Sequence, residues 1–94
     1  MEQNHWLFRK VDARVHAHGK SISALARKMG LSRPTLSGML KSPERLRAEI
    51  TEKLMEELGV PFDWLRSEGI EDALVNIESM NTDDWEDRAE DTDG

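Results

Sequence analysis

Apolar residues recur at helical spacing along most of the first eighty positions. Leu7, Val11 and Val15 lie four residues apart on one face, so the pattern predicts a helix over residues 3–18. The chain lacks the strict alternation of apolar and polar residues that a half-buried strand would show. This patterning, with only 5% aromatic residues, predicts an all-α fold.

Residues 21–41 predict two short helices joined by a tight turn. Ser21 can cap the first helix, and Gly30 follows it where a left-handed backbone is cheapest for glycine. Ser32 can cap the second helix, and Pro34 in its first turn loses no needed hydrogen bond. The inward-facing residues of the two helices, expected to form the core of this unit, are Leu25, Ala26, Met29, Leu36, Met39 and Leu40.

The spacing within this unit is more specific than that of a generic helical hairpin. Ala26 lies four residues before Gly30, and Leu36 lies six after it. Two steeply crossing helices need a small residue at the contact, a glycine at the turn and an aliphatic residue in the gap. The segment LARKMGLSRPTLSGML resembles the helix-turn-helix of the Cro/repressor-type (lambda repressor-like) family of bacterial and phage regulators. The Ala–Gly–Leu spacing alone would also suit a helical hairpin in a bundle that does not bind DNA.

The resemblance covers about residues 7–69. A further helix with start signals at 42–44 is expected to end at Gly59, and VPFDWLRSEG at 60–69 resembles the end of phage repressor DNA-binding domains. The side chains expected to close the core from these segments are Leu46, Ile50, Leu54, Leu58, Phe62 and Leu65. The resemblance therefore implies a compact five-helix DNA-binding domain at residues 1–69.

The remaining residues divide into two parts. Residues 70–80 carry apolar side chains every three or four positions, which predicts a short C-terminal helix and a possible dimerisation element. A helix of this length must pack on its own domain or on a partner. Residues 81–94 are acidic and rich in turn formers, and they are expected to form a tail that is disordered in isolation. Trp85 in this tail is either an incidental side chain or an anchor for a partner protein.

Charge is divided unevenly along the chain, whose net charge is −6. Residues 1–50 carry a net charge of +6 and residues 51–94 a net charge of −12. DNA phosphates respond to the local field within a Debye length of roughly 10 Å, so the basic half can bind DNA despite the acidic total. Arg9, Lys10 and Arg14 lie mostly off the apolar stripe of the first helix and are expected on its exposed surface.

Several classes of protein are disfavoured by composition. There is no cysteine for a disulfide or a thiolate metal site. His16 and His18 are two residues apart and would point to different sides of a helix. No metal or cofactor is therefore expected. No apolar run approaches the roughly 18 residues that a membrane span needs, and a signal-peptide core is missing, so the chain is expected to be soluble and cytoplasmic. No catalytic triad or glycine-rich phosphate loop is visible, so we do not expect an enzyme.

The resemblance implies which side chains contact double-stranded DNA. The second helix of the unit would lie in the major groove. The expected base contacts are Arg33, Pro34, Thr35, Ser37 and Lys41. Arg33 is the strongest of them, because a guanidinium can bridge O6 and N7 of guanine. The expected phosphate contacts are Lys20, Ser21, Ser23, Arg45 and Arg47. Gly38 and Ile22 depart from the family pattern, because they stand where the family often has polar residues.

One domain of this kind reads only a few base pairs, so a homodimer on an inverted-repeat operator is expected. The expected dimer interface is Phe62, Trp64, Ile70, Leu74 and Ile77. The expected function is a sequence-specific transcriptional regulator of the phage or prophage repressor type. Two other functions remain open: an antitoxin whose residues 81–94 fold on a toxin, and a protein-interaction module that has lost DNA binding. The acidic tail could also fold back over Arg33 and Lys41.

Overall fold

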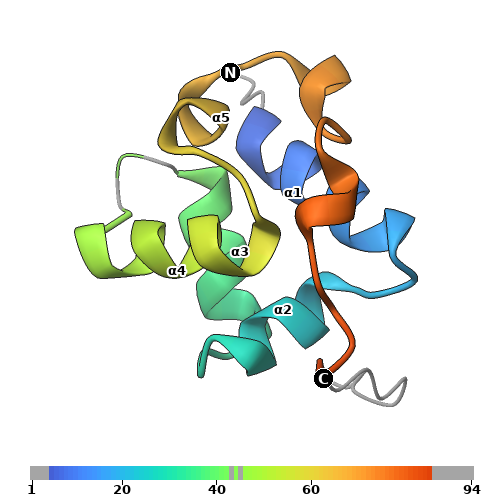
Figure 1. Ribbon diagram of the computed structural model, residues 1–94. Helices are drawn as coiled ribbons and strands as arrows, with labels where there is room; N and C mark the ends of the chain where they lie inside the picture. The colour runs from blue at the N-terminus through green and yellow to red at the C-terminus, as the bar shows by residue number, and fades with distance from the viewer. Residues whose placement is uncertain (1–4, 43, 45, 86–94) are drawn as a thin grey trace.

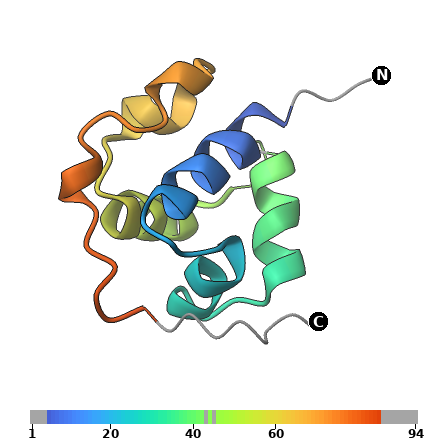
Figure 2. The ribbon, with the colours of Figure 1, turned by 90° about the vertical axis from the view of Figure 1, so that its right-hand side faces the viewer.

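A computed structural model describes residues 5–42, 44 and 46–85. Within these residues the chain forms five α-helices and two short 3-10 helices and no β-strand, which confirms the predicted all-α fold. The elements are α1 (Trp6–Ala17), α2 (Ile22–Lys28), α3 (Arg33–Lys41), α4 (Ala48–Leu58), α5 (Phe62–Arg66), η2 (Ile70–Asp72) and η3 (Ile77–Ser79). After α5 the chain returns past α1 and then runs down beside α2 (Figure 1 and Figure 2). None of the helices in the described ranges is long and apolar enough to cross a lipid bilayer.

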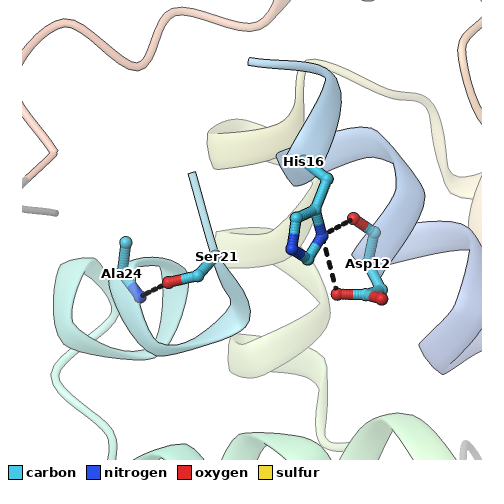
Figure 3. Close-up of polar contacts among 4 residues, drawn as sticks. All are labelled: Asp12, His16, Ser21 and Ala24. Carbon is cyan, nitrogen blue, oxygen red and sulfur yellow. Dashed lines mark hydrogen bonds and ion pairs between the residues drawn. The ribbon is translucent and has the colours of Figure 1, made fainter. Parts of the chain in front are cut away.

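The first turns of α2 and α3 are both capped by serine, as the sequence predicts. The Oγ of Ser21 accepts a hydrogen bond from the backbone N–H of Ala24 at 3.2 Å (Figure 3). The Oγ of Ser32 accepts one from the backbone N–H of Thr35 at 3.3 Å. Each cap satisfies one of the N–H groups that a helix leaves unpaired at its start, so the two helices begin at defined residues.

The turn between α2 and α3 is closed by Gly30, which has a φ of 77° in the left-handed region. The N–H of Gly30 donates to the backbone O of Arg27 at 3.1 Å, and the N–H of Leu31 donates to that of Ala26 at 2.8 Å. This pair of bonds is a Schellman motif, which ends a helix and reverses the chain. The helix-turn-helix geometry therefore follows from local signals on either side of the glycine.

One hydrophobic core joins all five α-helices. Leu7, Val11 and Val15 of α1 are fully buried, as their spacing predicts. The other buried members of this core are Ile22, Ala24, Leu25, Ala26, Met29, Leu36, Leu40, Leu54, Leu58, Val60, Trp64, Leu65, Met80 and Trp85. Two predicted core residues fall outside it: Met39 is only half-buried, and Phe62 is exposed. Trp64 takes the core position that was predicted for Phe62, because α5 turns its indole inward.

Helix α4 begins at Ala48, later than the start signals at 42–44 predicted. Arg47 has extended backbone angles (φ −93°, ψ 163°), and Leu46 packs against the core before the helix starts. The acidic residue of the first turn is therefore Glu49, which complements the positive end of the helix dipole.

The segment after α5 differs from its prediction. In place of one helix over residues 70–80, the chain forms η2 and η3, separated by turn residues 73–76 that end at Asn76 with a φ of 52°. The beginning of the predicted disordered tail is packed: Thr82 and Trp85 are buried. Residues 86–94, the rest of that tail, lie outside the described residues. Trp85 is therefore neither incidental nor an anchor for another protein in this structure, because it is part of the core of its own chain.

Arg14 explains why residues 70–80 do not form a regular helix. Its side chain is fully buried, which corrects the expectation that it lies on the exposed surface of α1. The Nε of Arg14 donates to the backbone O of Leu58 at 3.0 Å. Its terminal nitrogens donate to the backbone O atoms of Ala73 (2.8 Å), Val75 (2.7 Å) and Asn76 (3.0 Å). An α-helix would use such carbonyl groups in its own hydrogen bonds, whereas here all three accept from the guanidinium and only that of Asn76 also accepts a backbone N–H, that of Ser79.

Lys10 is the second buried cation of α1, and it too was expected on the surface. Its Nζ donates to the backbone O atoms of Trp64 and of Ser67, the latter at 2.7 Å, and lies 4.1 Å from the centroid of the Trp64 ring. Burial lowers the pKa of Lys10, and the nearby carboxylates of Asp72 and Glu71 oppose this shift. Burial likewise lowers the pKa of Arg14, against the charge of Glu78. The two cations fix α5 and the following segment onto α1.

Candidate DNA-binding surface

Helix α3 has one buried face and one open face. Leu36 and Leu40 are fully buried against the core. Arg33 and Lys41 are exposed and Ser37, between them at helical spacing, is half-buried, so these three residues form one outward row. Figure 2 shows α3 at the periphery of the molecule. The core thus fixes the helix while its outer side chains remain open to a partner.

The predicted base-contact residues at the start of α3 are all exposed. Arg33 and Pro34 form its first turn, directly after the Ser32 cap. The hydroxyl of Ser32 also donates to Oγ1 of Thr35 at 2.8 Å. The Thr35 side chain is therefore held at the helix start by the same residue that caps the backbone, and its own hydroxyl proton remains free to donate.

Lys41 lies at the opposite end of α3 and is directed toward α1. Its Nζ is 4.9 Å from the centroid of the Phe8 ring, a cation–π distance. With a rise of 1.5 Å per residue, the backbones of Arg33 and Lys41 are about 12 Å apart along the helix. The two long cationic side chains therefore lie at opposite ends of the exposed face of α3.

The predicted phosphate contacts surround α2 and precede α4. Lys20, Ser21 and Ser23 are half-buried near the start of α2, and Arg47 is exposed before α4. Arg45 lies outside the described residues. Ile22 is buried in the core, so this position supplies no polar side chain to a phosphate. The first turns of α2 and α3 contain no acidic residue, so neither turn places a carboxylate of its own at the positive end of its helix dipole.

Two histidines, His16 and His18, make polar contacts within the chain. The Nδ1 of His16 lies 2.9 Å from the backbone O and 3.0 Å from Oδ1 of Asp12 (Figure 3). The Nε2 of His18 lies 3.1 Å from the backbone O of Ile77. Among the described residues no cluster of three or more His, Cys, Asp or Glu side chains could hold a metal ion.

The residues predicted for a dimer interface are only partly available. Phe62, Ile70 and Leu74 are 49%, 42% and 50% exposed, and Ile77 is half-buried. Trp64 is not available, because it is buried in the core and its Nε1–H donates to the backbone O of Asp72 at 3.0 Å. The sequence interpretation also missed an exposed apolar residue, Val75.

An acidic side chain of the predicted tail, Asp84, lies beside the helix-turn-helix. Nζ of Lys28, at the end of α2, lies 3.3 Å from Oδ2 of Asp84. Trp85, the next residue, is buried in the core. Within the described residues, this contact places an acidic side chain beside α2 and not on the outer row of α3.

Comparison with known proteins agrees with this arrangement. A family model described as helix-turn-helix, of the Cro/C1 type, matches residues 12–65, which is more than half of the chain. The match runs from within α1 to α5 and contains both α2 and α3. No curated protein and no solved structure gives a significant match. The chain thus belongs to the Cro/C1-type helix-turn-helix family and is a DNA-binding transcriptional regulator.

Proposed function

We propose that this protein is a sequence-specific repressor of the phage or prophage type and that it inserts α3 into the major groove. The observation that carries the proposal is the division of α3 into a buried face, Leu36 and Leu40, and an open face that begins with Arg33. In the helix-turn-helix geometry the N-terminal residues of the second helix contact base edges, and the first helix crosses the DNA backbone.

Arg33 is the proposed principal reader of sequence. Its exposed guanidinium follows the Ser32 cap at the helix start, where it can donate two hydrogen bonds to O6 and N7 of one guanine. Thr35 and Ser37 can donate single hydrogen bonds, and Pro34 offers only apolar contact. Lys41, whose ammonium lies by the Phe8 ring at the far end of α3, contacts the outer end of the site.

The proposed phosphate contacts are Lys20, Ser21, Ser23 and Arg47. They add affinity that does not depend on sequence, and each phosphate neutralised steepens the fall of log K with log salt concentration by about 0.9. Substitution of Lys20 or Arg47 by alanine should therefore weaken binding to all duplexes alike and flatten the salt dependence. Substitution of Arg33 should instead change which duplexes bind.

We also propose a homodimer on two half-sites. The exposed apolar side chains of Phe62, Ile70 and Leu74 support this proposal, because such residues favour a contact that removes them from water. Two domains on half-sites one helical turn apart would supply the selectivity that one domain lacks. A monomeric mass in solution at tens of micromolar would contradict the dimer.

The proposal is tested by selection from a pool of random-sequence DNA duplexes. The wild type should enrich a motif with inverted-repeat half-sites, and Arg33→Ala should lose or relax one position of each half-site. Lys53→Ala, which also removes one positive charge, serves as the matched control and should enrich the wild-type motif, because Lys53 is exposed on α4 and belongs neither to the proposed DNA contacts nor to the proposed dimer interface. Weak binding with no enriched motif would contradict a sequence-specific regulator.

The antitoxin and interaction-module alternatives receive less support from the structure. The antitoxin hypothesis used Trp85 as the anchor for a toxin, and this side chain is buried in the core of its own chain. A neighbouring open reading frame whose product is toxic in the absence of this protein would restore the antitoxin function. Loss of salt-dependent DNA binding together with binding to a basic protein would instead favour the interaction module.

A further inference from the structure

Gly38 occupies an unfavourable position for a glycine. It lies inside α3, three residues from the end of the helix, and not at a turn. Glycine is among the least favourable residues in a helix interior, because it loses the most conformational freedom when the helix forms. A glycine in such a place needs a reason that outweighs this loss.

The fold of the chain does not supply that reason. The glycines with positive φ within the described residues are Gly19, Gly30 and Gly59, and Gly38 is not among them. A Cβ added at Gly38 would meet no atom outside its own helix backbone and its chain neighbours within 4 Å. Gly59 shows the opposite case, since a Cβ there would lie 2.8 Å from the backbone O of Ser79. The protein therefore has room for a side chain at position 38.

The neighbours of Gly38 belong to the open face of α3. Pro34 is one turn before it on the same side of the helix and is exposed. Together Pro34 and Gly38 form a low apolar strip without a side-chain hydrogen-bond donor. The row of Arg33 and Ser37 runs beside this strip, so a donor-rich row and a donor-free strip lie next to each other on the surface proposed to enter the groove.

We infer that Gly38 is a specificity-determining residue: it lets the backbone of α3 approach the base edges, and the Pro34–Gly38 strip contacts the C5-methyl group of a thymine. This inference rests on the proposed function, and it states which base a part of the proposed DNA-binding surface recognises. The thymine methyl is the apolar group that base pairs present in the major groove, and it suits a surface without donors or acceptors. The half-site should therefore contain a thymine beside the guanine read by Arg33.

The first test compares Gly38→Ala with the wild type on the duplex that the wild type selects. The added methyl group should raise the denaturation midpoint, since alanine favours the helix and the protein has space for it. The same methyl group should lower affinity for the selected duplex by tenfold or more, because it occupies the space needed by the base edge. Higher stability with lower affinity separates a contact role from a folding defect.

The second test removes the methyl group from the DNA. Each thymine of the selected half-site is replaced in turn by uracil, and binding is measured for both proteins. One replacement should weaken wild-type binding several-fold and have little effect on Gly38→Ala, which no longer makes the close contact.

The outcomes distinguish the inference from the function on which it rests. Specific binding by the wild type with unchanged or tighter binding by Gly38→Ala would overturn the inference alone. The same holds if no uracil replacement weakens wild-type binding. Failure of the wild type to select any duplex would overturn both.

Discussion

The α2–α3 unit and the segment from Val60 to Trp85 are held in place by different kinds of interaction. In α2–α3 the decisive hydrogen bonds join residues three to five apart, at the Ser21 and Ser32 caps and at the Gly30 turn. In the C-terminal segment they join residues that are up to 62 positions apart, from Arg14 to Asn76. The surface proposed to bind DNA is thus fixed locally, and the segment behind it is fixed by two buried cations of α1.

This difference indicates a division of tasks. A locally determined helix-turn-helix keeps its geometry as long as its caps, its glycine and its core residues are present. The C-terminal segment, by contrast, contributes to the core through Trp64, Met80 and Trp85 and depends on the side chains that hold it. Substitutions of the side chains that hold the C-terminal segment should therefore affect stability. Substitutions on the open face of α3 should instead affect DNA recognition.

The largest effect is expected for Arg14→Met, which keeps much of the length of the side chain and removes its donors. The carbonyl groups of Ala73 and Val75 would lose their hydrogen bonds from the guanidinium, and that of Asn76 would keep only its bonds from Ser79. The free energy of unfolding should therefore fall by about 4 kcal/mol. Chemical denaturation measures the loss, and hydrogen exchange should show the greatest loss of protection in residues 70–80. Arg9→Met, on the exposed surface of the same helix, should change stability by no more than about 0.5 kcal/mol. Equal effects of the two variants would contradict the role of Arg14.

A somewhat smaller effect is expected for Trp85→Ala. The loss of this buried ring should lower the free energy of unfolding by about 3 kcal/mol. Trp85→Phe is the control, because it keeps an aromatic ring and removes an indole N–H that has no hydrogen-bond partner in the part of the chain that the structure describes. Phenylalanine should therefore cost much less than alanine. A Trp85→Ala variant as stable as the wild type would mean that the segment is not packed, and Trp85 would again be either an incidental side chain or an anchor for a partner protein.

The contact between α4 and η3 can be tested with two glycines. Gly59→Ala and Gly19→Ala both place a side chain at positive φ, 66° and 74°. Position 59 also brings the Cβ to 2.8 Å from the backbone O of Ser79, whereas position 19 has no such neighbour within 4 Å. Denaturation should therefore show Gly59→Ala to be less stable than Gly19→Ala by about 2 kcal/mol. Similar stabilities would show that η3 does not lie against Gly59.

The smallest effect is a dependence of stability on alkaline pH. Burial lowers the pKa of Lys10 from its usual 10.5, so in the window between the two values the native side chain is neutral while the unfolded one still holds a proton. The unfolded state then binds more protons, and stability rises with pH by at most about 1.4 kcal/mol per unit. Below the lowered pKa this contribution is constant.

The measurement for Lys10 is the difference in unfolding free energy between the wild type and Lys10→Met as a function of pH. The difference should shift in favour of the wild type as pH rises through the window. A difference that is constant over the alkaline range would contradict the burial of the Lys10 ammonium.

Much of the helix-turn-helix could be predicted from the sequence because its determinants are local. Ser21, Ser32 and Gly30 each act within a few residues, and the apolar stripes identify Leu36 and Leu40 as core. Capping chemistry and helical periodicity are visible in a single sequence. The residues of the candidate DNA-binding surface could be predicted from the same pattern, because the side chains of α3 opposite its buried apolar stripe are the exposed ones.

The C-terminal segment could not be predicted in the same way. Lys10 and Arg14 each lie three residues after an apolar stripe residue, Leu7 and Val11, and this position faces the core as much as the stripe does. This spacing could have indicated that Lys10 and Arg14 are buried, but a charged side chain at such a position is usually exposed to solvent. The acceptors of these cations are backbone carbonyls, which carry no sequence signature, so neither the turns at 73–76 nor the inward position of Trp64 could be read from residue types.

The most direct test of the central claim is to locate the DNA on the protein by NMR. Isotope-labelled wild-type protein is titrated with the selected duplex, and changes in the backbone amide signals are mapped on the sequence. The DNA-binding surface proposed here requires the largest changes at residues 20–23 and 33–41, together with loss of the changes at 33–37 in Arg33→Ala. Changes confined to residues 62–85, with α3 unaffected, would contradict it.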